Sequence, residues 1–167
     1  MKKILSLTLA LAMLGTALTG CGSKTAAPET SVEPTQQTAP VQQEQSQTEK
    51  ALALINTFAT GDTDTARSLL ADGYIQHNLA YGTGADAFIG SVEYLASADV
   101  KTTVNNIRAF EDGDKVFLQT IYNFAGAGEQ VAFDIFRFDE NGKIAEHWDV
   151  METIADQSNW QNQNGKF

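Results

Sequence analysis

The chain has 167 residues, of which 11 are Lys or Arg and 21 are Asp or Glu, so its formal net charge is −10. A chain this acidic is not expected to bind nucleic acid, nor to be attracted by its own charge to anionic lipid headgroups. Its single cysteine, Cys21, excludes a disulfide within the chain and a zinc site built from several cysteines. The length suits one folded domain of ordinary size.

Residues 1–20 have the pattern of a secretory signal peptide, with Lys2 and Lys3 followed by an apolar stretch that runs to Leu18. The stretch is short compared with the roughly 20 residues that span a bilayer. The sequence Leu-Thr-Gly-Cys that ends at Cys21 resembles the lipobox of bacterial lipoproteins, whose cysteine receives a diacylglyceryl group before cleavage. We therefore expect a lipid on Cys21 to anchor the protein to a cell membrane, facing outside the cytoplasm. An uncleaved membrane anchor is the alternative.

Residues 21–48 are interpreted as a disordered linker that follows the lipid. This segment holds all three prolines of the chain and contains no aromatic residue, Leu, Ile or Met. It cannot bury enough apolar surface to fold by itself. All aromatic residues lie in residues 49–167, which we assign to the folded domain. Residues 1–48 hold three basic and three acidic side chains, so the domain keeps 8 basic and 18 acidic ones.

Apolar spacing predicts three helices followed by four strands in this domain. The helices are expected over residues 49–60, 64–71 and 84–96. Gly61 ends the first, Asp62 or Thr63 caps the second, and Gly73 ends it. The strands are expected over residues 100–110, 115–124, 129–138 and 143–152, because β-branched and aromatic residues dominate there and turn sequences separate them. This order indicates an α+β domain, with the helices covering one face of a curved antiparallel sheet.

The second predicted strand is apolar on both faces. Val116, Leu118 and Tyr122 alternate with Phe117 and Ile121, and successive side chains of a strand point to opposite faces. A sheet that is apolar on both faces needs a second cover besides the helices. We therefore expect a homodimer in which the outer faces of two sheets pack together.

The last predicted hairpin brings two acids and a histidine together. Asn141 and Gly142 form its turn, and a two-residue loop pairs Asp134 with Asp149. A four-residue loop pairs Asp134 with His147 instead. Both registers place all three side chains on one face of the sheet, whereas a bulged three-residue loop could break the alignment.

The curvature of the sheet decides what this face can do. On a concave face, burial and like-charge repulsion raise the pKa of at least one carboxyl, and the acids favour a protonated His147. Such a cluster suits proton transfer near neutral pH. On a convex face the same side chains are merely solvated, and periodicity leaves both alternatives open. Arg137 and Glu146 lie on the opposite face, where we expect an ordinary cross-strand ion pair.

Three segments together resemble a known family. They are Tyr-Ile-Gln-His-Asn at residues 74–78, Asp-Ile-Phe-Arg at 134–137, and Gly-Lys-Ile-Ala-Glu-His-Trp-Asp-Val at 142–150. This combination is similar to the SnoaL-like branch of the nuclear transport factor 2-like (NTF2-like) superfamily, and the similarity extends over about residues 51–167. The resemblance implies a cone of three helices around a curved antiparallel sheet, with a central pocket.

The resemblance also implies roles for the hairpin residues. In the polyketide cyclases of this family, the histidine and aspartate that correspond to His147 and Asp149 face the pocket. The aspartate is the acid and base of an intramolecular aldol closure that uses no metal or cofactor. Asp134 occupies a position where the cyclase has histidine, and this departure leaves the substrate open.

Further pocket groups are implied on the segment after the second helix and on the third predicted strand. The implied substrate contacts are His77, Asn78, Tyr74 and Phe136. Leu79 stands where relatives commonly have proline, so the loop that carries His77 departs from the family pattern. Taken alone, a single histidine in such a loop is more often structural or solvated than functional.

Three functions are compatible with these residues. The leading hypothesis is that Asp149, assisted by His147, removes a proton α to a carbonyl in a small apolar or polycyclic compound. Asp134, if protonated, or His77 would then bond the enolate oxygen. The second is a non-catalytic, ligand- or partner-binding lipoprotein of the cell envelope, which the anchored location favours. The third is a metal site formed by both histidines and an aspartate, against which the metal-free chemistry of the family counts.

Overall fold

The structure is a computed structural model and describes residues 44–167. The predicted signal peptide, Cys21 and almost all of the predicted linker lie outside the described residues. Within residues 44–167, no helix is both long enough and apolar enough to span a membrane.

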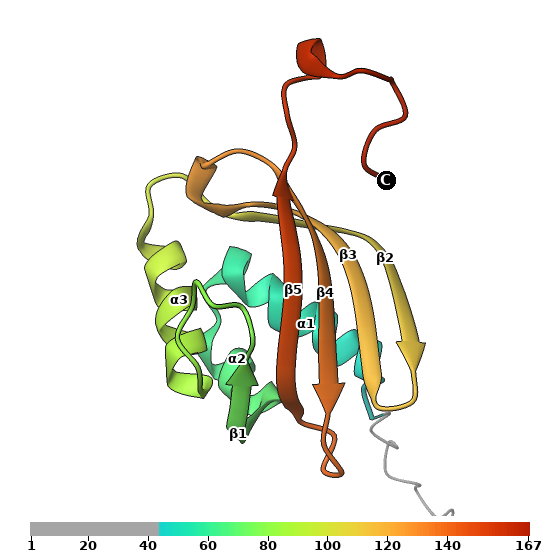
Figure 1. Cartoon of the computed structure of the whole chain (residues 1–167). Coiled ribbons are helices and arrows are strands. Elements are labelled where there is room, and N and C mark those ends of the chain that lie inside the picture. Colours follow the sequence, from blue (N-terminus) through green and yellow to red (C-terminus); the bar gives the residue numbers. More distant parts are fainter. Residues whose placement is uncertain (1–43) are drawn as a thin grey trace, which may run out of the picture. The chain divides into compact units, whose positions relative to one another are not determined.

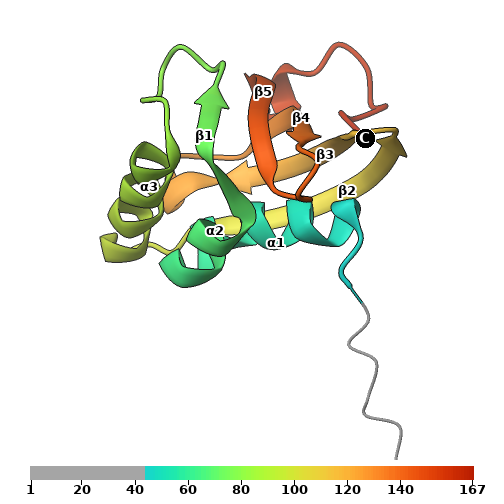
Figure 2. The ribbon, with the colours of Figure 1, turned by 90° about the horizontal axis from the view of Figure 1, so that it is seen from below.

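Three helices lie on one side of a curved sheet of five strands (Figures 1 and 2). The elements are α1 (Gln47–Thr60), α2 (Thr63–Leu69), β1 (Leu70–Gln76), α3 (Ala85–Ser97), β2 (Thr103–Asp112), β3 (Lys115–Asn123), η1 (Phe124–Gly126), β4 (Gln130–Phe138), β5 (Ile144–Thr153) and η2 (Gln157–Asn159). The strand order in the sheet is β1-β5-β4-β3-β2. The predicted α+β architecture, with helices on one face of a curved sheet, is confirmed.

Local capping explains where the first two helices begin and end. Ser46 and Glu49 form a capping box at the start of α1, in which each side chain bonds the backbone N–H of the other residue. Gly61 ends α1 in the left-handed conformation, with a φ of 75°, as predicted. The side chain of Asp62 then accepts a bond from the backbone of Thr65 and starts α2.

The prediction of a purely antiparallel sheet is wrong, because β1 is a fifth strand that pairs in parallel with β5. The second helix ends at Leu69 and the chain becomes extended at Leu70, before the predicted stop at Gly73. The short strand contains Asp72 and Gly73, which are poor strand formers, and its pairing shifts register between Leu70 and Ile75. The strand propensity of these residues and the alternation of apolar side chains therefore gave little indication of β1.

The hairpin of β4 and β5 keeps the register predicted for a two-residue loop. Asp134 lies opposite Asp149, and Phe136 lies opposite His147. The loop itself is one residue longer, since the backbone of Asp139 bonds that of Lys143. A shift between the pairs Arg137↔Glu146 and Phe138↔Ile144 places one extra residue on β5 and restores the predicted register.

The hydrophobic core fills the space between the helices and the inner face of the sheet. Its members include Leu54 and Ile55 of α1, Phe88 and Val92 of α3, and Val116, Leu118, Phe136 and Ile144 of the sheet. Burial of each large side chain stabilises the fold by about 1.5–3 kcal/mol. The core thereby fixes which face of the sheet is turned inward.

The outer face of the sheet carries apolar side chains that the described residues leave exposed. We call the exposed side chains of Phe110, Phe117, Phe133 and Val150 the outer apolar face; they are cross-strand or diagonal neighbours on β2 to β5. The C-terminal segment also meets this side of the sheet, where Gln119 Nε2 donates to the carbonyl oxygen of Lys166 at 2.8 Å.

Candidate functional site

A cavity of about 720 Å³ lies between the helices and the inner face of the sheet. Its helical side is lined by apolar and aromatic residues, among them Phe58 of α1 and Phe88 and Tyr94 of α3. Its sheet side carries the polar groups, which gather around Asp134 and Asp149. A mostly apolar pocket with a few convergent polar groups is the usual form of a small-molecule site.

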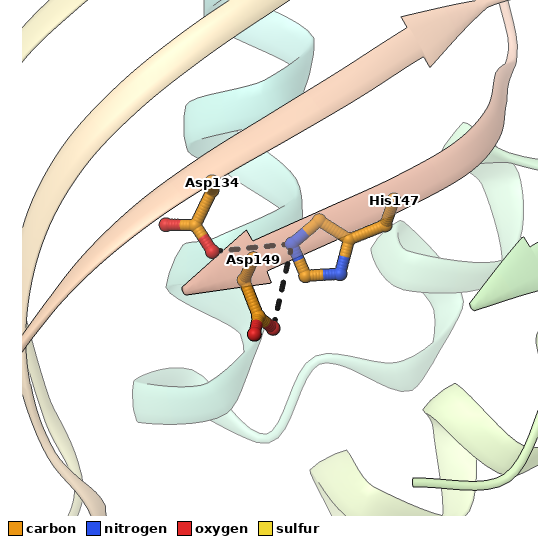
Figure 3. A group of neighbouring side chains, drawn as sticks. All are labelled: Asp134, His147 and Asp149. Carbon is orange, nitrogen blue, oxygen red and sulfur yellow. Dashed lines mark hydrogen bonds and ion pairs between the residues drawn. The ribbon is translucent and has the colours of Figure 1, made fainter. Parts of the chain in front are cut away.

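Asp134, His147 and Asp149 come together on the inner face, as the alternation predicted (Figure 3). Asp134 comes from β4, and the other two are alternate residues of β5. Asp134 is 3% exposed and His147 is 7% exposed. The alternative of a convex, solvated face is therefore wrong, because the helices cover the face that bears these side chains.

Both carboxylate oxygens of Asp134 lie within hydrogen-bonding distance of a polar group of the protein. Tyr122 donates its hydroxyl to Oδ2 at 3.0 Å, and His147 Nε2 lies 3.1 Å from Oδ1. Both oxygens of Asp134 are thus engaged by groups of the protein, which argues against the hypothesis that Asp134 bonds a substrate oxygen.

The end of β1 supports the other two members of the cluster. Gln76 Nε2 lies 2.9 Å from His147 Nδ1, and Asn78 Nδ2 donates to Asp149 Oδ1 at 2.7 Å. The backbone N–H of Asn78 also donates to Gln76 Oε1 at 2.9 Å. The parallel pairing of Gln76 with His147 brings this segment to the site. The unpredicted strand is therefore what positions the cluster.

Asp149 combines a raised pKa with one carboxylate oxygen that has no close partner among the described residues. Burial raises the pKa of Asp149 above its ordinary value, a charge on His147 and the bond from Asn78 partly offset this rise, and the charge of Asp134 adds a smaller increase. Its Oδ1 is occupied by Asn78, while Oδ2 lies 3.9 Å from His147 Nε2, beyond a normal hydrogen bond. The Oδ2 atom is therefore the oxygen best placed to take a proton from a ligand.

Tyr74 and Phe136 line the cavity beside this cluster, where the resemblance placed them. The Tyr74 side chain is buried, and its hydroxyl accepts a bond from Gln76 Nε2 at 3.3 Å. Burial, followed by the charges of Asp149 and Asp134, raises the pKa of Tyr74, so the hydroxyl keeps its hydrogen. Phe136 stacks on the ring of His147, with ring centroids 4.4 Å apart, and holds that ring against the wall.

The prediction that His77 is a polar group of the pocket is wrong. Its side chain points to the other side of β5, where Nε2 lies 2.9 Å from Glu146 Oε2 and the ring stacks on Trp148. Residues alternate along the extended segment, so His77 faces away from the side that Gln76 and Asn78 share. The expected ion pair between Arg137 and Glu146 on this outer side is confirmed.

Two site residues, Gln76 and Tyr122, were missed by the sequence analysis. Gln76 stands within the Tyr-Ile-Gln-His-Asn segment, and a strand there would have placed it on the same face as Tyr74 and Asn78. Tyr122 was taken only as an apolar residue of its strand, although a buried tyrosine hydroxyl usually has a polar partner. Here that partner is Asp134.

A metal site of two histidines and an aspartate does not form, since His77 lies elsewhere. Asp134, His147 and Asp149 each offer one atom that could ligate a metal ion, and these three atoms lie within 4.8 Å of one another. A cation could bridge this spacing. These side chains are instead paired with one another, with Tyr122 and with the end of β1. The described contacts account for the cluster without a cation.

The arrangement of three helices on a curved sheet around a pocket defines an NTF2-like domain. The SnoaL-like domain family matches residues 51–147, which is more than half of the chain, so the chain belongs to this family. The match includes Asp134 and His147 and ends two residues before Asp149. No curated protein matches the chain.

Solved structures agree on the fold. An NTF2-like protein of unknown function from Cytophaga hutchinsonii has a TM-score of 0.57 at 16% identity, covering 66% of this chain and 94% of that one. An LEH-like epoxide hydrolase of M. tuberculosis has 0.54 at 18% identity, covering 62% and 80%. IdmH, a candidate polyketide cyclase from Streptomyces antibioticus, has 0.52 at 18% identity, covering 65% and 93%. At these identities the likeness concerns the fold alone.

Proposed function

We propose that this SnoaL-like domain performs acid/base carbon chemistry without a cofactor on a small apolar or polycyclic carbonyl compound. The observation that carries the proposal is Asp149, a carboxylate with a raised pKa and one oxygen left for a ligand, at the polar end of a cavity lined with aromatic residues. A base of this kind works best when its pKa is moved toward the working pH. The reaction class is aldol condensation, cyclisation or isomerisation.

The first step is proton abstraction. Asp149 Oδ2 takes a proton from the carbon next to the carbonyl, the electrons of the C–H bond form the C=C bond of an enolate, and the negative charge moves to the oxygen. The Tyr74 hydroxyl, which lines the same cavity and retains its hydrogen, donates to that oxygen.

The second step returns the proton. In a cyclisation the enolate carbon attacks a second carbonyl carbon of the same molecule, a C–C bond forms, and the new alkoxide takes the proton from Asp149. In an isomerisation the proton returns to a different carbon. Both routes leave Asp149 ionised and ready for another cycle.

The charge of the site indicates a neutral substrate. Two carboxylates reach the cavity, and no Lys or Arg is among the described residues that line it. An anionic ligand would place a further negative charge next to Asp134 and Asp149 in a poorly solvated space. The names of two structural neighbours, a candidate polyketide cyclase and an epoxide hydrolase, support small-molecule chemistry in this fold.

Deuterium exchange tests the proposal without knowledge of the natural substrate. The full chain is mixed in heavy water with β-tetralone, a neutral bicyclic ketone with acidic α-protons, and incorporation of deuterium is followed by mass spectrometry. We expect exchange above the buffer rate, a loss of that excess in Asp149→Asn, and a decrease of about 100-fold in Tyr74→Phe, the size found when one oxyanion donor is removed. Glu152→Gln neutralises an acid on the outer side of the same strand and should exchange like the wild type.

A non-catalytic binding protein is the second candidate, and the same preparation distinguishes it. Native mass spectrometry of the full chain would then show a retained, unaltered small molecule, and exchange of β-tetralone would stay at the buffer rate. That pair of results would reject the catalytic proposal. Retention of a ligand together with loss of exchange in Asp149→Asn would support it.

We also propose that a lipid on Cys21 anchors the protein to a cell membrane, facing outside the cytoplasm. The support is the sequence Leu-Thr-Gly-Cys after a basic and apolar N-terminal segment. Expression of the full chain and of Cys21→Ser in bacteria, followed by membrane fractionation and mass spectrometry of the N-terminus, tests this. The wild type should carry an acyl mass and sediment with membranes, and an unmodified cysteine would contradict the proposal.

A further inference from the structure

We propose that Gln76 is a positioning residue that holds His147 in the neutral form with its hydrogen on Nε2, and that this leaves Asp149 as the base of the cluster. The structural part stands on the contacts around the imidazole. The catalytic consequence rests on the proposed function. Gln76 lies at the end of β1 directly opposite His147 in the parallel pairing.

The orientation of the Gln76 amide follows from its neighbour on the chain. The backbone N–H of Asn78 can only donate, and it lies 2.9 Å from one end of the Gln76 side chain. That end must therefore be the oxygen, Oε1. The other end is the NH2 group, which faces His147 Nδ1 at 2.9 Å and also contacts the Tyr74 hydroxyl at 3.3 Å.

An amide N–H directed at Nδ1 decides the state of the imidazole. Nδ1 must accept, so it carries no hydrogen, and in the neutral ring the hydrogen then sits on Nε2. Nε2 faces an acceptor, Asp134 Oδ1, at 3.1 Å. In this form of the ring, Nδ1 accepts a hydrogen bond from the Gln76 amide and Nε2 donates one to Asp134, so both nitrogens have a suitable partner.

The charged and titratable groups around the ring come from four strands. Asp134 faces it from β4 and Asp149 from β5, Tyr74 of β1 reaches it through the Gln76 amide, and Tyr122 of β3 reaches it through Asp134. From charge alone the two acids favour a protonated His147. The Gln76 contact opposes that form, because a hydrogen on Nδ1 would point at the hydrogens of the amide.

The chemical consequence is a division of roles between neighbouring residues. An Nε2 that already carries a hydrogen cannot take a proton from a substrate, and it has no lone pair for a cation. It can only donate, which it does to Asp134. Proton abstraction is then left to Asp149, whose Oδ1 is held by Asn78, the residue two positions after Gln76.

Nuclear magnetic resonance of the full chain tests the assignment directly. The chain has only two histidines, so nitrogen-labelled protein gives two sets of ring signals, and His77→Gln identifies those of His147. Long-range proton–nitrogen spectra distinguish a protonated, pyrrole-type nitrogen from an unprotonated, pyridine-type one. We expect a pyrrole-type Nε2 and a pyridine-type Nδ1 at neutral pH. A pyridine-type Nε2, or two protonated nitrogens, would overturn the proposal.

Two variants test whether Gln76 causes this state. Gln76→Glu replaces the donor with an acceptor of the same size, so the pyridine-type signal of Nδ1 should be lost. Gln76→Leu removes the donor, and the Nδ1 signal should shift toward the average of the two neutral forms. Gln130→Leu is the matched control for Gln76→Leu, since Gln130 lines the same cavity without a described side-chain bond to His147 and this change adds no charge; it should leave the wild-type pattern unchanged.

The outcomes separate this inference from the proposed function. An unchanged Nδ1 signal in both Gln76 variants, with circular dichroism confirming their fold, would show that Gln76 does not set the state of His147. If Gln76→Glu does not fold, Gln76→Leu and the wild-type spectrum still decide. A wild type with the expected spectrum but no deuterium exchange would reject the catalytic proposal alone.

Discussion

Replacing Asp149 with asparagine should stabilise the protein at neutral pH while it removes the proposed base. The pKa of Asp149 is raised in the folded state, chiefly by burial, so the folded protein binds this proton more tightly than the unfolded chain does. The contribution of Asp149 to stability is therefore most favourable at acidic pH, below the pKa of the unfolded state, and decreases as the pH rises through the pKa of the folded state. Asparagine has no charge to bury and can still accept the bond from Asn78.

The magnitude follows mainly from the burial of the charge. Burial is the largest cause of the raised pKa of Asp149 and the charge of Asp134 the smallest, and leaving a buried charged group without full compensation costs roughly 3 kcal/mol. The bond donated by Asn78 to the ionised carboxylate offsets about 1.5 kcal/mol of this. We expect Asp149→Asn to gain roughly 2 kcal/mol, or a rise in Tm of roughly 8 °C for a domain of this size.

Urea unfolding of the full chain at neutral and at mildly acidic pH measures the effect. The gain should be largest at neutral pH and should shrink toward the ordinary aspartate pKa, where the wild-type carboxyl also becomes neutral. Glu152→Gln, which removes an exposed charge paired with Lys166, should change stability by less than about 0.5 kcal/mol. A variant less stable than the wild type at neutral pH, or a gain independent of pH, would refute this account of Asp149.

Three further predictions concern the cluster, the ligand and the outer apolar face. Tyr122→Phe should lower the free energy of unfolding in urea by about 1.5–3 kcal/mol, because Asp134 loses a buried donor. Tyr94→Phe, at an exposed tyrosine, should change it by almost nothing. Equal losses in the two variants would contradict the role of the Tyr122 bond. Calorimetry should show that naphthoate binds about 100-fold more weakly than acetylnaphthalene. The reason is that a negative charge about 5 Å from a carboxylate costs about 3 kcal/mol of binding free energy. Equal affinities would argue against a cavity that excludes anions. We propose that a second copy of the chain covers the outer apolar face. Sedimentation should then show a dimer, and Phe133→Lys or Val150→Lys should dissociate it. A wild-type monomer at high micromolar concentration would reject the dimer proposal.

The order of the three helices and of the four antiparallel strands, though not β1, could be predicted from the sequence because it depends on local properties. Helical spacing and caps such as Gly61 and Asp62 determine where the first two helices meet, and they need no knowledge of distant residues. The period of two along β4 and β5 likewise requires Asp134, His147 and Asp149 to share one face in any register that keeps the pleat. These features were determined by the chain itself.

Only the tertiary structure decided which face that is and what surrounds the three side chains. Alternation says that residues share a face, but the packing of the helices on the sheet decides that this face is buried. The pairing of β1 with β5 joins residues about 70 positions apart, and it turns Gln76 and Asn78 toward the cluster and His77 away from it. Non-local contacts of this kind leave no period in the sequence. The histidine that the family resemblance placed in the pocket, His77, therefore lies outside the site, and the glutamine beside it, Gln76, lies within.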